Sequence, residues 1–212
     1  MCPGNGEYRG LRVLIRELIG ARRIVTVSGS QSGVGKTSLA EIVLRSLSDF
    51  AAIKVTITDK AGMVTDDERE IMVPRTDTWR MKESGAVQVV WIKSSEDALA
   101  ESLKSALVKI GPCRGILVEG NSILRHLHPT IALFVVTALL HNMKPSRVQA
   151  LQKADVCVIN QINNKIPSRE ILESISRQNP GLSILAINLL DPLSTSGHDY
   201  DRLLTLLKER TG

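Results

Sequence analysis

Short runs of consecutive apolar residues alternate with amphipathic segments along nearly the whole chain of 212 residues. The apolar runs cover residues 24–27, 51–57, 87–92, 115–118, 131–136, 156–159 and 182–187. Strands that are apolar on both faces are typical of a parallel sheet that helices cover on both sides. The pattern therefore predicts an α/β protein with a three-layer α/β/α architecture and a mainly parallel sheet.

The amphipathic segments between these runs have apolar residues at helical spacing. They predict helices over residues of about 9–19, 36–47, 78–84, 94–109, 148–151, 168–177 and 199–208. Gly20 is the expected stop of the leading helix. Thr76 or Asp77 is the expected N-cap of the helix at 78–84, and Gly85 its stop.

Two segments between these elements are less regular. The polar stretch 59–69 indicates a mobile loop, and residues 71–73 indicate a short strand. No internal repeat or long linker interrupts the alternation of strands and helices. We therefore expect residues 1–212 to form a single domain with a leading helix at about 9–19.

Composition and charge exclude several functional classes. The chain is 43% hydrophobic and 23% charged, which is ordinary for a folded protein, and its net charge is +5. Its basic residues are spread out, and the nearest approach to a patch is Arg9, Arg12, Arg16, Arg22 and Arg23. Only 3% of the residues are aromatic, so base stacking has few partners and nucleic acid is not an expected ligand.

Cysteine usage and hydropathy indicate the compartment. Cys2, Cys113 and Cys157 are far apart and lack a C-x-x-C spacing, which favours reduced thiols in the cytoplasm. The sequence has neither a signal peptide core nor an apolar stretch long enough to span a membrane. We expect a cytoplasmic protein with no membrane partner.

A glycine-rich turn joins the first apolar run to the next helix. Its candidate ligand-binding residues are Gly29, Ser30, Gln31, Ser32, Gly33, Val34, Gly35, Lys36, Thr37 and Ser38. Glycines allow successive backbone N–H groups to face a phosphate, and the following helix directs the positive end of its dipole there. Lys36 adds a positive charge for the phosphates, and the Thr37 hydroxyl is an oxygen ligand suited to Mg²⁺. The turn predicts a P-loop, or Walker A motif, that binds a nucleoside triphosphate.

One position departs from the usual motif. The pattern G-x-x-x-x-G-K-[ST] places its first glycine at residue 30, which is Ser30 here. Gly29 lies one residue earlier, whereas Gly33 and Gly35 are in their expected places. Because Gly33, Gly35 and Lys36 shape the phosphate cradle, nucleotide binding remains the prediction.

Two acidic residues follow apolar runs in the way that Walker B carboxylates do. Glu119 ends the run Gly-Ile-Leu-Val-Glu, where its carboxylate could hold Mg²⁺ or polarise a water molecule. Asp59 follows the second run and could be a second metal ligand or a base, or a turn aspartate. We take Lys36, Glu119 and Asp59 as candidate catalytic residues, and Thr37, Glu119 and Asp59 as candidate metal ligands.

Residues 160–163 occupy the place where GTPases carry N-K-x-D. Asn160 is in position to contact a base, but Asn163 stands where the guanine-binding aspartate is expected. A neutral amide cannot accept both hydrogens that guanine offers, so the sequence leaves ATP and GTP open, with a lean toward ATP or relaxed specificity.

Three further positions have two interpretations each. His126 and His128 could bind a metal or a substrate, or belong to a loop near the active face. Lys54, inside an apolar run, is expected to point toward phosphate or an acid. Arg80 could contact phosphate or form a surface ion pair.

Several of these segments resemble the family of molybdopterin-guanine dinucleotide biosynthesis protein B (MobB). The similar segments are the P-loop, the strand with Lys54, residues 77–80 with Gly85-Ala86, and Leu117-Val118-Glu119-Gly120, which together span residues 24–120. The resemblance implies a P-loop fold of the SIMIBI class (signal recognition, MinD, BioD), nucleoside triphosphate binding and a homodimer. It also implies that Asp77 and Arg80 lie near the nucleotide and Glu119 near the metal.

Three hypotheses for function follow. The first is Mg²⁺-dependent nucleoside triphosphate binding with slow hydrolysis, in an adaptor or maturation factor that serves a protein client. The second is a small-molecule kinase using ATP, whose acceptor site would be lined by Asn121, Arg125 and His126. The third is a nucleotide-binding module without turnover.

Overall fold

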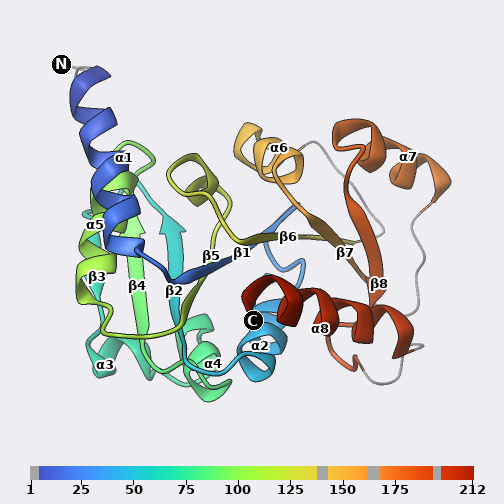
Figure 1. The fold of residues 1–212 in the computed structure, drawn as a ribbon, viewed down its shortest axis with the longest axis horizontal. Coiled ribbons are helices and arrows are strands. Elements are labelled where there is room, and N and C mark those ends of the chain that lie inside the picture. The colour runs from blue at the N-terminus through green and yellow to red at the C-terminus, as the bar shows by residue number, and fades with distance from the viewer. Residues whose placement is uncertain (1–4, 138–142, 162–167, 193–196) are drawn as a thin grey trace.

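The computed structural model describes residues 5–137, 143–161, 168–192 and 197–212 (Figure 1). Its strands form one sheet in the order β3-β4-β2-β5-β1-β6-β7-β8. Their bounds are β1 Arg23–Gly29, β2 Phe50–Ile57, β3 Met63–Thr65, β4 Val89–Ser94, β5 Gly115–Glu119, β6 Ile131–Val136, β7 Val156–Asn160 and β8 Ser183–Ile187. Every neighbouring pair is parallel except β3 and β4 at one edge.

Helices cover both faces of this sheet. Their bounds are α1 Asn5–Ile19, α2 Lys36–Ser46, α3 Glu68–Ile71, α4 Asp77–Glu83, α5 Leu99–Lys109, η1 Ser122–Arg125, α6 Pro145–Gln152, α7 Arg169–Gln178 and α8 Gly197–Thr211. One buried apolar cluster joins the sheet to α1, α5, η1, α6 and α7. The other cluster joins it to α2, α3, α4 and α8. Figure 1 shows α6 and α7 on one side of the sheet and α2 and α8 on the other. The predicted three-layer α/β/α architecture is confirmed.

Most predicted elements occur with shifts of a few residues at their ends. The stop at Gly20 is confirmed, since it follows α1 in the left-handed backbone region with φ +59°. Thr76 is the N-cap of α4, where its hydroxyl accepts a hydrogen bond from the N–H of Trp79. Helix α5 begins at Leu99 rather than at 94, because β4 continues through Ser94.

The interpretation of residues 59–73 was wrong in two respects. Residues 63–65, predicted within a loop, form β3 and pair with β4 at the edge of the sheet. Residues 71–73, predicted as a strand, are instead the last residue of α3 and the two residues after it. Helix α3 is a single turn whose N-cap Asp67 accepts from the N–H of Arg69. Ile71 is apolar because it is buried at the end of that turn. Among the described residues, no helix has the length and apolarity needed to cross a membrane.

Candidate functional site

The glycine-rich turn connects the end of β1 to the start of α2, which is the place that a P-loop requires. Gly35 is the N-cap of α2 and has φ +107°, a conformation that side chains rarely adopt. A Cβ atom at Gly35 would also lie 2.6 Å from Nδ2 of Asn160. At Gly29 a Cβ atom would lie 2.7 Å from Cγ1 of Val34. The glycines therefore allow a close fold of backbone around the turn.

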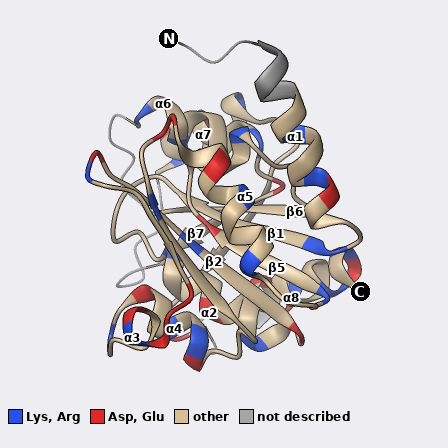
Figure 2. Cartoon of the chain, turned by 90° about the vertical axis from the view of Figure 1, so that its left-hand side faces the viewer, with Lys and Arg blue, Asp and Glu red and all other residues tan. Residues whose placement is uncertain are grey.

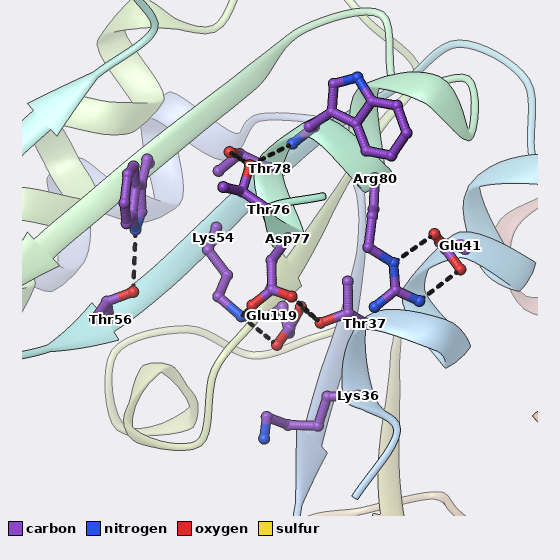
Figure 3. Close-up of polar contacts among 12 residues, drawn as sticks. Lys36, Thr37, Glu41, Lys54, Thr56, Thr76, Asp77, Thr78, Arg80 and Glu119 are labelled. Atoms are coloured by element: carbon purple, nitrogen blue, oxygen red, sulfur yellow. Dashed lines mark hydrogen bonds and ion pairs between the residues drawn. The ribbon is translucent and has the colours of Figure 1, made fainter. Parts of the chain in front are cut away.

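Two neighbouring strands deliver opposite charges to the mouth of this turn. Lys54 on β2 and Glu119 on β5 are partners in register, so their side chains lie on the same face of the sheet. The Nζ atom of Lys54 lies 2.6 Å from Oε1 of Glu119 and 2.5 Å from Oδ2 of Asp77, the first residue of α4. A single ammonium group therefore bridges two carboxylates that come from different elements (Figure 3).

The hydroxyl of Thr37 completes the cluster. Its Oγ1 lies 2.9 Å from Oδ1 of Asp77 and 3.1 Å from Oε2 of Glu119. Thr37 is the second residue of α2, so the P-loop helix, β5 and α4 each contribute one oxygen-bearing side chain. Hydroxyl and carboxylate oxygens are the donors that Mg²⁺ prefers in proteins. Here the two carboxylates contact the ammonium of Lys54, and the hydroxyl contacts both carboxylates.

The charges in this cluster perturb one another. Burial alone would lower the pKa of Lys54, but Glu119 and Asp77 outweigh it and raise that pKa above its ordinary value. Burial would raise the pKa of Asp77, but its hydrogen bond and attraction to Lys54, with help from Thr37 and Arg80, hold the pKa below its usual range. Both groups are therefore charged near neutral pH.

A cavity of about 310 Å³ opens beside this cluster. Its lining is Ser32, Gly33, Gly35, Lys36, Thr37, Ser38, Lys54, Asp77, Arg80 and Glu119. Nζ of Lys36 donates to the carbonyl oxygen of Gln31 at 3.1 Å. Burial lowers the pKa of Lys36, and nearby Lys54 acts in the same direction, while Glu119 opposes the shift. An anion in the cavity would gain from both lysines.

An ion pair at the rim of the cavity connects two of its walls. Arg80 forms a two-pronged ion pair with Glu41 on α2, with Nε–Oε1 and Nη2–Oε2 distances of 2.9 and 3.0 Å, and its Nη2 also donates to Oγ of Ser38. This ion pair ties α4 to the P-loop helix (Figure 3). Of the two interpretations for Arg80, the structure shows the ion pair, at the rim of the cavity.

Asn160 lies behind the loop rather than in the cavity. It is buried, its Nδ2 donates to the carbonyl of Val34 at 3.0 Å, and its Oδ1 accepts from the N–H of Leu189 at 3.1 Å. Asn121 has a similar role, because its Oδ1 accepts from the N–H of Gly29 at 2.8 Å. Both amides therefore hold the backbone of the P-loop through hydrogen bonds and do not line the cavity.

The structure brings together most of the residues that the sequence singles out. Glu119, Asp77, Arg80 and the second half of the P-loop line one cavity. Gly29, Ser30, Gln31 and Val34, although described, are outside that lining. Ser30 is buried, and its N–H donates to the carbonyl of Val135. Asn163 lies outside the described residues.

Asp59 is not part of this site. It is exposed, two residues beyond the end of β2, and does not line the cavity. The residue of β2 that belongs to the site is Lys54, which contacts Asp77 and Glu119. Its position inside an apolar run predicted a partner of this kind. The contributions of Glu41 and Asn121 have no recognisable signal in the sequence, because each depends on a contact between distant elements.

The three residues expected to line the acceptor site of a kinase do not line the cavity beside the P-loop. Asn121 is bonded to Gly29, whereas Arg125 contacts Glu96 and Gln149 instead. His126 and His128 line a different cavity. Among the described residues, no group of three or more His, Cys, Asp and Glu side chains is placed to hold a metal ion.

Strand order, the loop after β1 and the carboxylate at the end of β5 define the P-loop NTPase fold. Solved structures with this fold include the hydrogenase maturation factor HypB from Archaeoglobus fulgidus, with 15% identity and a TM-score of 0.58 over 98% of this chain and 100% of that one. HypB from Helicobacter pylori, solved in complex with nickel, has 14% identity and a TM-score of 0.60 over 97% and 95%.

At this level of identity the likeness concerns the fold alone. No family model matches the chain. A search of curated proteins finds no match either. The MobB resemblance therefore remains a prediction from the sequence.

Proposed function

We propose that this protein binds a nucleoside triphosphate together with Mg²⁺ and hydrolyses it slowly. The observation that carries the proposal is the meeting of Thr37, Asp77 and Glu119 at the mouth of the P-loop. The Thr37 hydroxyl contacts both carboxylates, and the two carboxylates share one cation, the ammonium of Lys54. In P-loop proteins the hydroxyl after the lysine and an acid at the end of a strand hold the metal of the metal–nucleotide complex.

The oxygen donors present fit Mg²⁺. Thr37, Asp77 and Glu119 would hold the ion, whose charge neutralises phosphate oxygens when it is bound. The ammonium of Lys54 places a positive charge between the carboxylates of Asp77 and Glu119, which supports a cation-binding role for this pair. Lys54 also limits the repulsion between Asp77 and Glu119, so it keeps the donors in place.

The chain's own residues have separable roles in binding. Backbone N–H groups of the loop and the start of α2 face the phosphates, and Lys36 exchanges the carbonyl of Gln31 for a phosphate oxygen. Asn160 and Asn121 keep the loop in its bound shape. Glu119 is the group placed to orient a water molecule, because Asp59 lies outside the cavity.

We further propose that the protein acts as an adaptor or maturation factor for a protein client. It draws support from the MobB resemblance and from the archaeal neighbour, which is named a hydrogenase maturation factor. Arg125 and His126, two of the three residues that a kinase would use for its acceptor, do not line the cavity beside the P-loop, which favours this role over the kinase alternative. The homodimer implied by the resemblance stays a prediction, which light scattering coupled to size-exclusion chromatography checks.

A thermal-shift panel tests nucleotide binding. The full chain is heated with ATP, GTP, ADP or GDP, each with and without Mg²⁺, and the panel is repeated on Lys36→Ala. A ligand at 100 times its dissociation constant stabilises the fold by about 2.7 kcal/mol, which the variant should lose. The control is Lys60→Ala, because Lys60 is an exposed lysine in the loop after β2 and does not line the cavity. Absence of a shift with every nucleotide contradicts the proposal.

Turnover separates the remaining alternatives. We expect slow phosphate release with Mg²⁺, loss of release in Glu119→Gln, and retention of nucleotide binding in that variant. Binding without release in the parent chain would identify a module without turnover. The same panel ranks ATP against GTP, for which the amide at position 163 predicts no strong guanine preference.

A further inference from the structure

A second cavity, of about 610 Å³, lies between α1 and the segment that leads from η1 to β6. Its lining includes Ile24 and Thr130, which lie at the beginnings of β1 and β6. The P-loop begins at the other end of β1, five residues after Ile24, which corresponds to about 16 Å along an extended strand. The cavity is therefore distinct from the nucleotide site.

Basic side chains from two distant parts of the sequence meet in this cavity. Arg12 and Arg16 on α1 and Arg22 before β1 belong to the scattered arginines of the N-terminal region, and His126 and His128 come from the segment after η1. A hydrogen bond between Nη2 of Arg12 and the carbonyl of Arg125 connects the two walls. Figure 2 shows basic positions on α1.

No carboxylate of a described residue forms an ion pair with Arg12, Arg16 or Arg22. Arg12 donates to the carbonyl of Arg125, and Arg22 donates to the carbonyls of Leu18 and Ile19. Among the described residues, none forms a hydrogen bond or ion pair with the side chain of Arg16. Among the described residues that line the cavity, none is acidic.

Glu96, an acid that acts on His126, has partners outside the cavity. Glu96 pairs with Arg125 and accepts a hydrogen bond from the hydroxyl of Ser122. Burial lowers the pKa of His126, and Arg12 and Arg125 lower it further, with only Glu96 acting against them. The potential inside the cavity is therefore positive, which disfavours a metal cation at the histidine pair and favours an anion.

The floor of the cavity is apolar. Ile15, Ile24 and Leu127 are buried there, and Val13 and Ile19 complete the apolar lining. Pockets of a few hundred Å³ with an apolar floor and a few converging polar groups are typical of small-molecule sites. A ligand that suits both parts has a charged head and an apolar body.

We propose that this cavity binds a small organic anion whose head group is a dianionic phosphate ester and whose body is apolar. Arg16 and Arg12 contact the head group as charge-assisted hydrogen-bond donors, and His126 and His128 contribute ring N–H groups. The apolar body lies against Ile15, Ile24 and Leu127. The proposal is independent of nucleotide binding at the P-loop.

The two sites are joined through a short piece of chain. Glu119 at the metal cluster and Asn121 at the P-loop are followed directly by η1 and then by His126 and His128. A ligand that contacts the histidines therefore binds the segment whose first residues hold the P-loop backbone.

Histidine ring signals in proton–carbon NMR spectra give a readout inside the cavity. The full chain, labelled at histidine and assigned with His126→Gln and His128→Gln, is titrated with phenyl phosphate at pH 7.5. We expect saturable shifts of the His126 and His128 signals and none for His198 on α8. Arg16→Gln and Arg12→Gln should each weaken binding at least tenfold, because a charged hydrogen-bond donor is lost.

Controls separate this site from general attraction to a basic protein. Arg45→Gln removes an exposed arginine of α2 and should change the affinity less than twofold. Lys36→Ala should also leave it unchanged, which distinguishes the cavity from the P-loop. Benzyl alcohol, which lacks the charge, should not bind, and benzoate should bind more weakly than phenyl phosphate.

Several outcomes overturn the proposal. Absence of saturation at His126 and His128, or equal weakening in Arg16→Gln and Arg45→Gln, shows that the cavity is no anion site. Loss of the shifts in Lys36→Ala moves the binding to the P-loop. Tighter binding of benzoate than of phenyl phosphate overturns the assignment of a dianionic head group. Circular dichroism of each arginine variant confirms that it is folded.

Discussion

The Nζ atom of Lys54 lies 2.6 Å from Oε1 of Glu119, and the two residues are partners in register on β2 and β5. The Glu119 side chain is only 1% exposed, so protein groups rather than water stabilise its negative charge. A buried carboxylate without a counter-charge is costly, because water no longer solvates it. The ion pair therefore allows an acid to sit beside the P-loop before any ligand arrives.

Lys54→Met should destabilise the fold because it leaves Glu119 buried and unpaired. Loss of one partner of a buried pair costs about 3–5 kcal/mol, and the 42% exposure of the Asp77 side chain reduces the expected loss to about 2–3 kcal/mol. Urea denaturation measures the free energy of unfolding of each protein. The double variant Lys54→Met with Glu119→Gln should regain part of the stability that Lys54→Met loses.

Lys104→Met is the matched control for this prediction. Lys104 also forms an ion pair, with Glu101 at 3.2 Å, but both side chains are exposed. Such surface pairs contribute about 0.2–1 kcal/mol, so the control should lose far less stability. Added Mg²⁺ should stabilise Lys54→Met more than the parent chain, because the ion replaces the missing charge. An equal loss of unfolding free energy in Lys54→Met and Lys104→Met would contradict the importance of the buried pair.

The shifted pKa values of Lys54 and Asp77 predict how the ion pair responds to pH. The pKa of Lys54 is raised in the fold, so its stabilisation is complete below the unfolded value of about 10.4 and is lost as pH rises through the folded value. The pKa of Asp77 is lowered, so its stabilisation is present above about 3.9 and is lost as pH falls through the folded value.

Urea midpoints of the parent chain and Lys54→Met across the pH range test this sign. The stability difference between the two proteins should be flat from about pH 5 to pH 9 and should shrink toward both extremes. A change in that difference between pH 6 and pH 8 would mean that another titrating group controls the pair.

Thiol reactivity should distinguish Cys157 from Cys113. Burial raises the pKa of the Cys157 thiol to about 12, so almost none of it is thiolate at pH 8. Cys113 is only half-buried. In a Cys2→Ser background, Ellman's reagent should react quickly with one thiol and with the second only after unfolding. Cys113→Ser should remove the fast reaction, and a fast reaction that survives it would contradict the burial of Cys157.

The sequence predicts the fold and half of the site for a definite reason. Parallel strands and a P-loop depend on local patterns, namely apolar runs, glycines and a lysine next to a hydroxyl, which can be read within about 40 residues. Glu119 is recognisable because it ends an apolar run. The edge strand β3 was missed because three residues of mixed character carry no periodic signal.

The rest of the site depends on tertiary register, which no local pattern encodes. Asp59 and Lys54 lie on or near the same strand, and only the pairing of β2 with β5 decides that Lys54 faces Glu119. Convergence of Arg16 with His128 likewise depends on how α1 packs over the start of the sheet. Asn160 was expected to contact the nucleotide base, because it stands where GTPases carry the asparagine of N-K-x-D. In the structure its amide nitrogen and oxygen both bond to backbone groups instead.

Asn160→Ala should weaken nucleotide binding as well as stability. The variant leaves the carbonyl of Val34 and the N–H of Leu189 without their partners in a buried place, which should cost about 2–3 kcal/mol in urea unfolding. Because Val34 belongs to the P-loop, the shift produced by Mg²⁺ and nucleotide should fall too. Asn179→Ala is the control: Asn179 Nδ2 donates to the carbonyls of Leu151 and Ala154, away from the loop. That variant should lose stability but keep its nucleotide affinity, and equal affinity losses in both variants would mean that Asn160 acts only through general stability.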